Sequence, residues 1–512
     1  IADGRVYLPM TMVTKEINSR FYWDKSEKVL IYSLPDAVLK FTADKTEYVE
    51  QAWDGSVERS EDYPVLKKIG KERYIDAEYV KSHTRADMGI YDDPRRIAIR
   101  TQWGEKDVVT ARRETPIRYK GGIKSEVLRN AQDGETFVVL DPYDDWTQIC
   151  TEDGFLGWIS TEDTTPVETK ALAEADFDEP EYTSIQRDHK INMLWHQVMS
   201  SDANYTIYNV LESSPGINTI SPTWFYFTGE EGEVASSATY DYVSYCHDRG
   251  IEVWALFSNE FTSGSSTDRV FDSELTDKVL SSSSKREAAI RQVINVVKEY
   301  DIDGVNIDFE SISADGADDY IQFIREMSIA CRYEGIVLSV DNYVPKFTQY
   351  YNRKEQGIWA DYVVIMGYDE TTGGSGTPGP VASQQFVREG ISDTLAMVDK
   401  DKVINGIPFY TRVWCTDTSG EVSSFACGMT EALSYLTDHG VEPEYKEDAG
   451  LMYGEYVSDV NGATYQIWLQ DATAVEDEMK MISESDIAGV ASWKSGFESG
   501  TEIWDIISRY MN

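Results

Sequence analysis

The second half of the chain, from about Gln186, alternates short apolar runs with amphipathic segments, and this pattern limits the possible folds more than any other feature. Short apolar runs are typical of buried strands, whereas apolar residues spaced three and four apart are typical of helices. Such alternation indicates an α/β fold with a parallel sheet covered by helices. The predicted strands are 191–194, 219–223, 251–257, 305–309, 336–340, 362–366, 403–407 and 489–493.

Helical spacing is clearest on both sides of the fourth predicted strand. The apolar positions are Ile290, Val293, Ile294 and Val297 before it, and Tyr320, Phe323, Ile324, Met327 and Cys331 after it. Eight strand-helix units predict a (β/α)8 TIM barrel over residues 186–512. The surplus length at about 410–475, between the seventh and eighth strands, predicts an α+β insertion that walls one side of a cleft. Its expected strands are 451–456 and 464–469.

Residues 1–105 contain an internal repeat with an offset of 67 to 68 residues. Each copy predicts a strand, a helix and a hairpin, and we expect two small α+β lobes that share a sheet. The first copy comprises 6–13, 21–24 and 28–32, and the second comprises 73–80, 90–92 and 96–100. The repeat resembles the copper-amine-oxidase N-terminal-like repeats of bacterial surface proteins. No copper is expected, because the segment has no His cluster.

Residues 106–165 contain short β runs separated by turn signals, which predict a small β-barrel. Trp146 and the Gly157-Trp158 pair resemble bacterial SH3-like domains, which often accompany cell-wall enzymes. Both tryptophans are explained more simply as core residues than as a ligand platform. The acidic, proline-containing segment 166–185 is predicted to be a linker.

The formal net charge of −43 argues against a nucleic-acid partner, because phosphates require a basic surface. Contact with an anionic cell wall would have to use hydrogen bonds and stacking. No apolar run approaches the roughly 18 residues of a membrane-spanning helix. The chain begins at Ile1 rather than Met, as it would after removal of a signal peptide or anchor. We therefore expect an extracellular or cell-wall-associated protein.

The five cysteines are scattered without CxxC spacing, so neither a zinc site nor a disulfide framework is indicated. Only Cys415 and Cys427 could pair within one loop, and free buried thiols are the alternative. With five His and no glycine-rich phosphate loop after a strand, no metal and no cofactor is expected.

Segment 303–310, Asp-Gly-Val-Asn-Ile-Asp-Phe-Glu, overlaps the fourth predicted strand. Because side chains alternate along a strand, Asn306, Asp308 and Glu310 share one face. In a barrel this face points inward and rises to the carboxyl end, where active sites lie. Three buried polar side chains are costly without compensation, so the row is either catalytic or a buried polar network.

This segment matches the DGxxxDxE motif and resembles the family 18 glycoside hydrolases over about 186–512. The resemblance implies hydrolysis of β-linked N-acetylglucosamine (GlcNAc) polymers by a retaining mechanism in which the substrate's acetamido oxygen is the nucleophile. It implies that Glu310 protonates the glycosidic oxygen and that Asp308 holds the acetamido group. Asp303 and Gly304 take the structural positions of the motif.

Two departures from the family pattern matter. Asn306 stands where the family more usually has Asp, and we count it among the substrate-binding candidates. Since Asn cannot carry a second negative charge, we expect the coupling of a carboxylate pair to be absent. The spelling of the motif resembles the branch of spore-cortex-fragment lytic glucosaminidases. On the third strand the family often has SxGG, but residues 256–260 read Leu-Phe-Ser-Asn-Glu.

Further candidates follow three other predicted strands. Residues 366–369, Met-Gly-Tyr-Asp, match the family's MxYD element, which implies that Tyr368 hydrogen-bonds the acetamido oxygen and that Met366 and Asp369 lie near the sugar. Trp493 ends the eighth strand, where the family has the aromatic floor of the −1 sugar. Weaker candidates for sugar contact are Asn342, Tyr343, Tyr410 and Arg412.

The motif branch and the SH3-like module favour peptidoglycan or its fragments as substrate. Chitin and N-glycan cores are alternatives, because each presents a GlcNAc in the −1 site. A non-catalytic glycan-binding barrel is a second interpretation, which the presence of Glu310, Tyr368 and Trp493 disfavours. A third is that the N-terminal modules bind the cell wall and the barrel is secondary.

Overall fold

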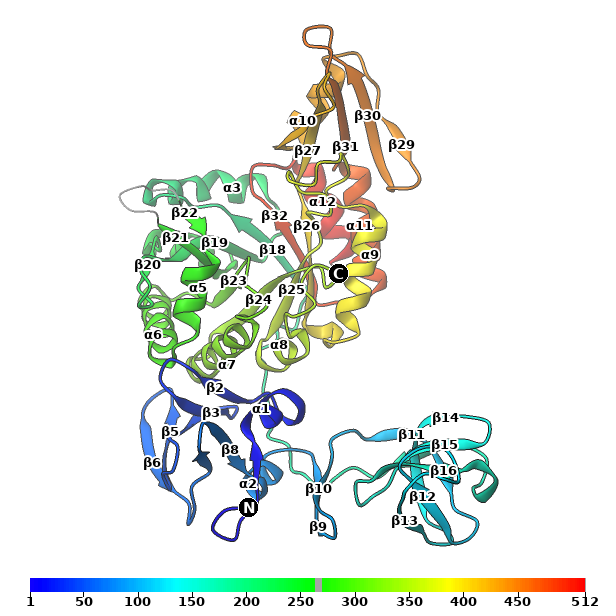
Figure 1. Cartoon of the computed structure of the whole chain (residues 1–512). Coiled ribbons are helices and arrows are strands. Elements are labelled where there is room, and N and C mark those ends of the chain that lie inside the picture. The colour runs from blue at the N-terminus through cyan, green and yellow to red at the C-terminus, as the bar shows by residue number, and fades with distance from the viewer. Residues whose placement is uncertain (263–268, 512) are drawn as a thin grey trace.

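Eight parallel strands close into a barrel at the centre of the computed structural model, which describes residues 1–262 and 269–511 (Figure 1). β18 pairs with both β19 and β32, and β19 also pairs with β21, so the ring is complete. All eight predicted strands, and with them the TIM-barrel fold, are confirmed. The strands are β18 (Ile191–His196), β19 (Thr219–Phe227), β21 (Glu252–Thr262), β23 (Gly304–Asp308), β24 (Val337–Tyr343), β25 (Tyr362–Met366), β26 (Val403–Pro408) and β32 (Gly489–Trp493).

The two helices with the clearest apolar spacing are α6 (Ser283–Tyr300) and α7 (Ala317–Glu334), and every predicted apolar position on them is buried. In the sequence α6 precedes and α7 follows β23, the strand that carries the motif. The other helices around the barrel are η3 (Ser201–Thr206), α3 (Ile207–Ser213), α4 (Tyr240–His247), α5 (Ser273–Leu280), α8 (Arg353–Trp359), α9 (Gln384–Leu395), η4 (Lys400–Lys402), α11 (Ala472–Glu484) and α12 (Thr501–Tyr510). Two short strands, β20 (Val234–Ser236) and β22 (Arg269–Phe271), pair antiparallel with β19 and β21, respectively.

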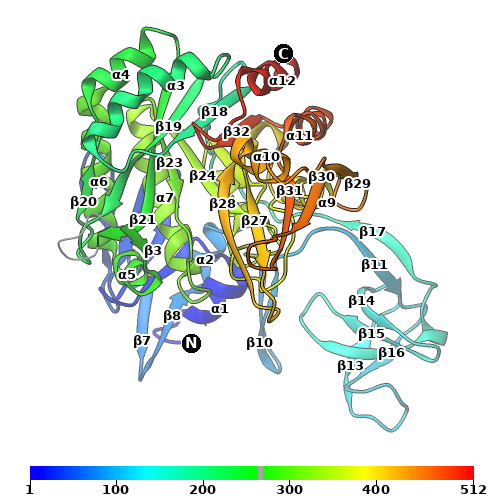
Figure 2. The ribbon, with the colours of Figure 1, turned by 90° about the horizontal axis from the view of Figure 1, so that it is seen from above.

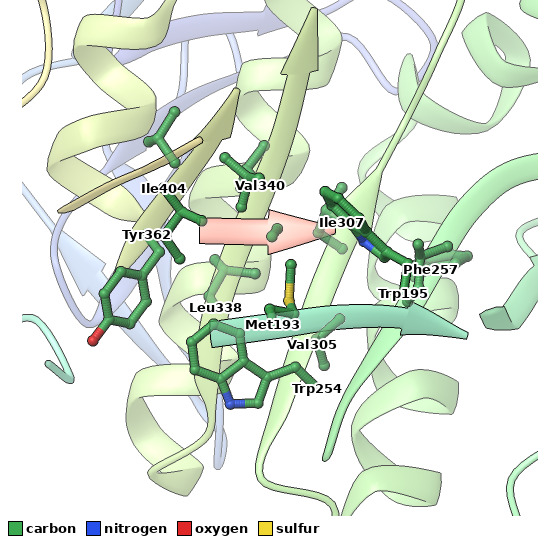
Figure 3. Packing of buried hydrophobic residues seen from close by; sticks show 14 of the residues in the cluster. Met193, Trp195, Trp254, Phe257, Val305, Ile307, Leu338, Val340, Tyr362 and Ile404 are labelled. Atoms are coloured by element: carbon green, nitrogen blue, oxygen red, sulfur yellow. The ribbon is translucent and has the colours of Figure 1, made fainter. Parts of the chain in front are cut away.

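Asp303 and Gly304 stand at the start of β23. Asp303 Oδ2 accepts the Val253 backbone N–H at 2.8 Å and lies 2.8 Å from His247 Nε2. A Cβ atom on Gly304 would lie 2.7 Å from the ring of Trp254. Figure 3 shows this tryptophan beside Val305 at the packed wall of the barrel. Only glycine therefore allows β23 to pack this closely against the Trp254 side chain.

The two copies of the N-terminal repeat meet through their first strands. β1 (Tyr7–Pro9) pairs antiparallel with β8 (Glu72–Asp76), and β7 (Leu66–Ile69) completes this small sheet. The hairpins of the two copies lie in different sheets. The hairpin of the first copy, β2 (Phe21–Asp24) and β3 (Val29–Ser33), continues through β4 (Ala37–Phe41), β5 (Glu47–Ala52) and β6 (Ser56–Ser60). The hairpin of the second copy is β9 (Asp87–Asp92) with β10 (Arg95–Arg100), and the helical segments are α1 (Met10–Met12), η1 (Val13–Ile17) and α2 (Ala77–Ser82).

The five-stranded sheet β2–β6 buries both of its faces near β2, β3 and β4. Alternate side chains point to opposite faces of a strand. Tyr22, Ile31 and Val38 join the apolar core of the barrel, whereas Phe21, Leu30 and Leu39 join a separate N-terminal core. Figure 1 shows this sheet lying against the α6 and α7 side of the barrel.

Residues 104–172 form a seven-stranded antiparallel sheet that is set apart from the barrel (Figures 1 and 2). Within the predicted linker 166–185, Glu168–Leu172 forms β17 and pairs with β11, so this part of the segment belongs to the sheet. Further along, the Ile185 N–H donates to Asp361 Oδ1 at 2.6 Å. The other strands are β11 (Gly104–Thr110), β12 (Thr115–Arg118), β13 (Val127–Ala131), β14 (Thr136–Pro142), β15 (Trp146–Cys150) and β16 (Leu156–Ser160), followed by η2 (Thr161–Asp163).

Between β26 and β32 the chain forms a five-stranded antiparallel sheet with one helix, α10 (Met429–Thr437). Its strands are β27 (Tyr410–Thr416), β28 (Val422–Gly428), β29 (Glu444–Lys446), β30 (Leu451–Val457) and β31 (Thr464–Leu469). Figures 1 and 2 show the sheet beside the barrel helices α9 and α11. Cys415 and Cys427 lie in its first two strands at different registers, and both are free thiols. Across residues 1–262 and 269–511, no helix has the length and apolar character needed to span a membrane.

Candidate active site

Asn306 points into the barrel, as predicted, but four hydrogen bonds to the barrel interior occupy its side chain. Its Oδ1 accepts from Trp195 Nε1 at 2.9 Å and from Ser221 Oγ at 3.0 Å. Its Nδ2 donates to Ser339 Oγ at 2.9 Å and to Asp341 Oδ1 at 2.7 Å. The residue is fully buried. The prediction that Asn306 binds substrate is therefore wrong, because an amide can make no more bonds than these and no surface is left for a sugar.

Asp308 lies two residues after Asn306 on the same inward face of β23 and is also buried. Its Oδ1 has no hydrogen-bond partner among the residues that the structure describes. Burial raises the pKa of Asp308 well above its usual range, and the negative charges of Glu310, Asp341 and Glu260 act in the same direction. The site therefore holds an acidic group that is costly to ionise before a positively polarised partner arrives.

Glu310 lies two residues after the end of β23, and Asn259 of β21 fixes its backbone from both sides. The Glu310 N–H donates to Asn259 Oδ1 at 2.8 Å, and Asn259 Nδ2 donates to the Glu310 carbonyl at 2.7 Å. The next residue, Ser311, has a φ of 54°, a conformation rare outside glycine and found at functional sites. Burial raises the pKa of Glu310, which favours the protonated form that a general acid requires.

Tyr343, at the end of β24, donates a hydrogen bond from its hydroxyl to Glu310 Oε2. This bond stabilises the ionised carboxylate and opposes the effect of burial on the Glu310 pKa. Burial and the neighbouring Glu310 raise the pKa of Tyr343 itself, so its hydroxyl remains a donor. Tyr343 was predicted as a sugar contact, and the structure places its hydroxyl on the acid.

The adjacent residue, Asn342, faces away from the site. Its Nδ2 donates to Gln356 Oε1 of α8 at 2.8 Å, and the residue is buried. Alternation along β24 sends Asn342 to the helix layer and Asp341 and Tyr343 to the interior. The predicted sugar contact of Asn342 is therefore wrong. Asp341 is the residue that the prediction missed.

The residues of the MxYD element lie at the end of β25. Met366 and Tyr368 are buried, and the negative charges of Asp308, Asp341 and Asp369 contribute, after burial, to a raised Tyr368 pKa. Asp369 has a φ of 59° and accepts a hydrogen bond from the Tyr410 hydroxyl at 2.6 Å. Tyr410 of β27 thus contacts Asp369, which lies three residues after β25.

Trp493 ends β32, and its ring centroid lies 5.9 Å from that of Trp195 in an edge-on arrangement. Because Trp195 donates to Asn306, the two tryptophans link the eighth strand to the interior network. Arg412 on β27 donates a hydrogen bond from Nη1 to Ser424 Oγ at 3.3 Å. Its Nε is buried and has no hydrogen-bond partner among the described residues.

Three residues that contact the predicted site residues were not among the predictions: Asp341, Asn259 and Trp195. Alternation along the fifth predicted strand would have placed Asp341 inward, since Ser339, Asp341 and Tyr343 have the same spacing as the polar row of β23. Asn259 lies in the segment that departs from the family pattern, so the resemblance gave no signal there. The pairing of Trp195 with Asn306 depends on contact across the barrel, which no local pattern contains.

Known proteins resemble this chain in sequence and in fold. The sequence profile of glycosyl hydrolases family 18 matches residues 269–498. The uncharacterized glycosylase YvbX of Bacillus subtilis (strain 168) is 26% identical over 302 residues, which are 57% of this chain and 84% of that protein.

The cortical fragment-lytic enzyme of Bacillus anthracis is 24% identical over 234 residues, which are 44% of this chain and 54% of that enzyme. The chain thus matches about half of that enzyme's length. The crystal structure of the Bacillus cereus spore cortex-lytic enzyme SleL has a TM-score of 0.56 at 19% identity, covers 67% of this chain and 78% of its own, and shares the barrel fold. The chain therefore carries a glycosyl hydrolase family 18 domain and is a glycoside hydrolase.

Proposed function

We propose that the enzyme hydrolyses β-linked GlcNAc glycans, with peptidoglycan or its fragments as the favoured substrate. The observation that carries the proposal is the pair of buried acids Asp308, the last residue of β23, and Glu310, two residues later, whose negative charge acts on Asp308. A cortical fragment-lytic enzyme among the relatives favours peptidoglycan over chitin or N-glycan cores. The resemblance of the N-terminal modules to those of bacterial surface proteins supports action outside the cell or at the cell wall.

In the proposed reaction the substrate's acetamido oxygen attacks the anomeric carbon, while Glu310 donates its proton to the departing glycosidic oxygen. The acetamido group becomes a positively charged oxazolinium ring. Asp308 accepts its N–H and stabilises the charge, and the Tyr368 hydroxyl donates to the acetamido oxygen. Glu310, now a carboxylate, takes a proton from the water that opens the ring.

The surrounding residues support these roles. Burial keeps Glu310 protonated to higher pH than a solvated glutamate. The hydrogen bonds to Asn259 fix the Glu310 backbone. A fixed geometry of the reacting groups can lower the activation barrier by several kcal/mol. Trp493 offers an indole ring on which the −1 sugar can stack.

The test is hydrolysis of purified peptidoglycan, chitin oligomers and N-glycans side by side by the whole chain and by Glu310→Gln. Glutamine keeps the shape of the side chain but has no proton to donate, so we expect kcat to fall by about 100-fold or more. Released reducing ends, measured by chromatography, give the rate and the preferred substrate.

Glu274→Gln is the matched control, because Glu274 is exposed on α5 and, within the described part of the chain, pairs only with Lys278 at 3.3 Å across one helical turn. It should retain full activity. Full turnover by Glu310→Gln would refute the catalytic role of Glu310. If the wild type binds all three glycans but cleaves none, the barrel is a glycan-binding protein instead.

A further inference from the structure

A second buried carboxylic acid stands beside Asp308 inside the barrel. β23 and β24 pair Asn306 with Ser339 and Ile307 with Val340, so the next residues, Asp308 and Asp341, lie level on adjacent strands. Adjacent strands are about 4.8 Å apart, which brings two inward carboxyl groups of the same level within reach of each other. Asp341 is 2% exposed and Asp308 is 8% exposed, so both carboxyl groups are largely shielded from solvent.

The hydrogen bonds at the two acids are unequal. Asp341 Oδ1 accepts the Asn306 amide at 2.7 Å, and the other three bonds of Asn306 fix the direction of that amide. Asp308 Oδ1 has no donor among the described residues. A buried carboxylate needs donors, whereas a neutral acid does not. The surroundings therefore favour the anion on Asp341 and the proton on Asp308.

We propose that Asp341 is the proton-sharing partner of Asp308, with one proton between them that rests on Asp308 and passes to Asp341 when Asp308 takes up the acetamido N–H. The Asp308 O–H bond breaks, an Asp341 O–H bond forms, and the pair carries one negative charge throughout. Asn306 is the positioning residue that aims Asp341. The inference rests on the proposed function, because the substrate amide triggers the transfer.

Under this proposal the second carboxylate comes from β24 instead of from position 306, so Asn306 does not remove the coupling of a carboxylate pair. Burial raises the pKa of Asp341 well above its usual range, and the Asn306 bond opposes this. The other titratable groups that face the pair are Glu260, Glu310, Tyr320, Tyr343, Tyr351 and Tyr368. None of them changes in the variants below.

Two carboxyl groups that share a proton titrate in two steps, one below and one above the pKa of a lone group in the same place. The pair is active after the first step, which sets the acid limb of kcat/KM. Asp341→Asn leaves Asp308 alone with a single, higher step, so the acid limb should move to higher pH. The double variant Asn306→Asp/Asp341→Asn returns a second carboxylate on β23, with the new amide at position 341 as its donor, and should restore the wild-type limb.

The experiment measures the pH profile of kcat/KM of the whole chain on a GlcNAc oligomer for wild type, Asp341→Asn and the double variant. An unshifted acid limb in Asp341→Asn, or a double variant that behaves like Asp341→Asn, would overturn the proposal. If Asp341→Asn fails to fold, the double variant decides alone, because the proposal requires its acid limb to match the wild type.

A second measurement needs no activity and separates failure of this inference from failure of the proposed function. A carboxyl group whose pKa is raised by folding makes the free energy of unfolding fall with pH until its folded pKa is passed. The second, higher titration step of the pair makes the free energy of unfolding continue to fall to a higher pH than a lone Asp308 would. As pH rises through neutrality, Asp341→Asn should therefore gain stability relative to wild type in urea denaturation. A constant difference would exclude the shared proton even in an inactive protein.

Discussion

At the scale of single residues, Tyr343 acts on the protonation of the proposed acid against the effect of burial. Its hydroxyl bond stabilises the Glu310 carboxylate and lowers the pKa of Glu310 against the larger effect of burial. Tyr343→Phe removes that bond, so the Glu310 pKa should rise and the acid should stay protonated to higher pH. We expect the base limb of kcat/KM, measured on a GlcNAc oligomer, to move to higher pH.

Tyr350→Phe is the control for this change. The Tyr350 hydroxyl donates to the Ile312 carbonyl at 3.0 Å and touches no carboxylate in the described structure. Its removal should leave both limbs in place. A Tyr343→Phe enzyme with the wild-type base limb would show that the bond does not govern Glu310.

At the scale of elements, the ends of β21 and β23 are joined by the side chain of Asn259, which is fully buried. Asn259→Ala frees the Glu310 backbone and leaves a buried N–H and C=O without partners. We expect unfolding to require about 1–3 kcal/mol less free energy and kcat to fall by about 10- to 100-fold through misplacement of the acid. Urea denaturation and steady-state kinetics measure the two effects.

Thr276→Val separates the loss of stability from the loss of position. Thr276 Oγ1 accepts from the same Asn259 amide at 3.1 Å but does not contact Glu310. This variant should lose stability, since hydrogen bonds typically contribute about 1 kcal/mol to the free energy of unfolding. Its kcat should stay within about threefold of wild type, because the bonds between Asn259 and Glu310 remain. Equal losses of kcat in the two variants would mean that the bonds to Glu310 have no special role.

At the scale of the whole molecule, the N-terminal sheet is part of the barrel's support. Asp24 Oδ2 accepts the Ser283 N–H and Glu27 Oε1 accepts the Ser284 N–H, each at 2.6 Å, so the last residue of β2 and the turn that follows it accept hydrogen bonds from the first turn of α6. α6 leads directly into β23. Deletion of residues 1–105 would therefore disturb the barrel as well as any binding to the cell wall.

Glu27→Ala tests this support. Burial disfavours the Glu27 carboxylate, but the hydrogen bonds from Ser284, Ser282 and Ser283 outweigh it and lower the pKa of Glu27 to about 2. Stability from a lowered carboxyl pKa is present above the unfolded pKa and is lost as pH falls through the folded value. The variant should lose about 1 kcal/mol of unfolding free energy at neutral pH, and the difference should vanish as the pH falls toward 2.

The exposed Glu58 of β6 provides the control, because Glu58→Ala makes the same chemical change away from α6. It should unfold like wild type in urea at every pH. A Glu27→Ala variant as stable as this control at neutral pH would mean that the sheet and the barrel are energetically independent.

The sequence alone determined the eight barrel strands, the apolar faces of α6 and α7, and the inward direction of Asp308. These features depend on side-chain periods of 2 and 3.6 residues, which are local and can be read along a single segment. The partners of those residues were decided by tertiary structure. Asp341 stands level with Asp308, Trp195 reaches Asn306 across the barrel, and Tyr343 bonds Glu310 because strand register and barrel closure bring distant segments together. A register pairs residues of two strands, so the pattern along one strand gives the face of a side chain but not its partner on the next strand.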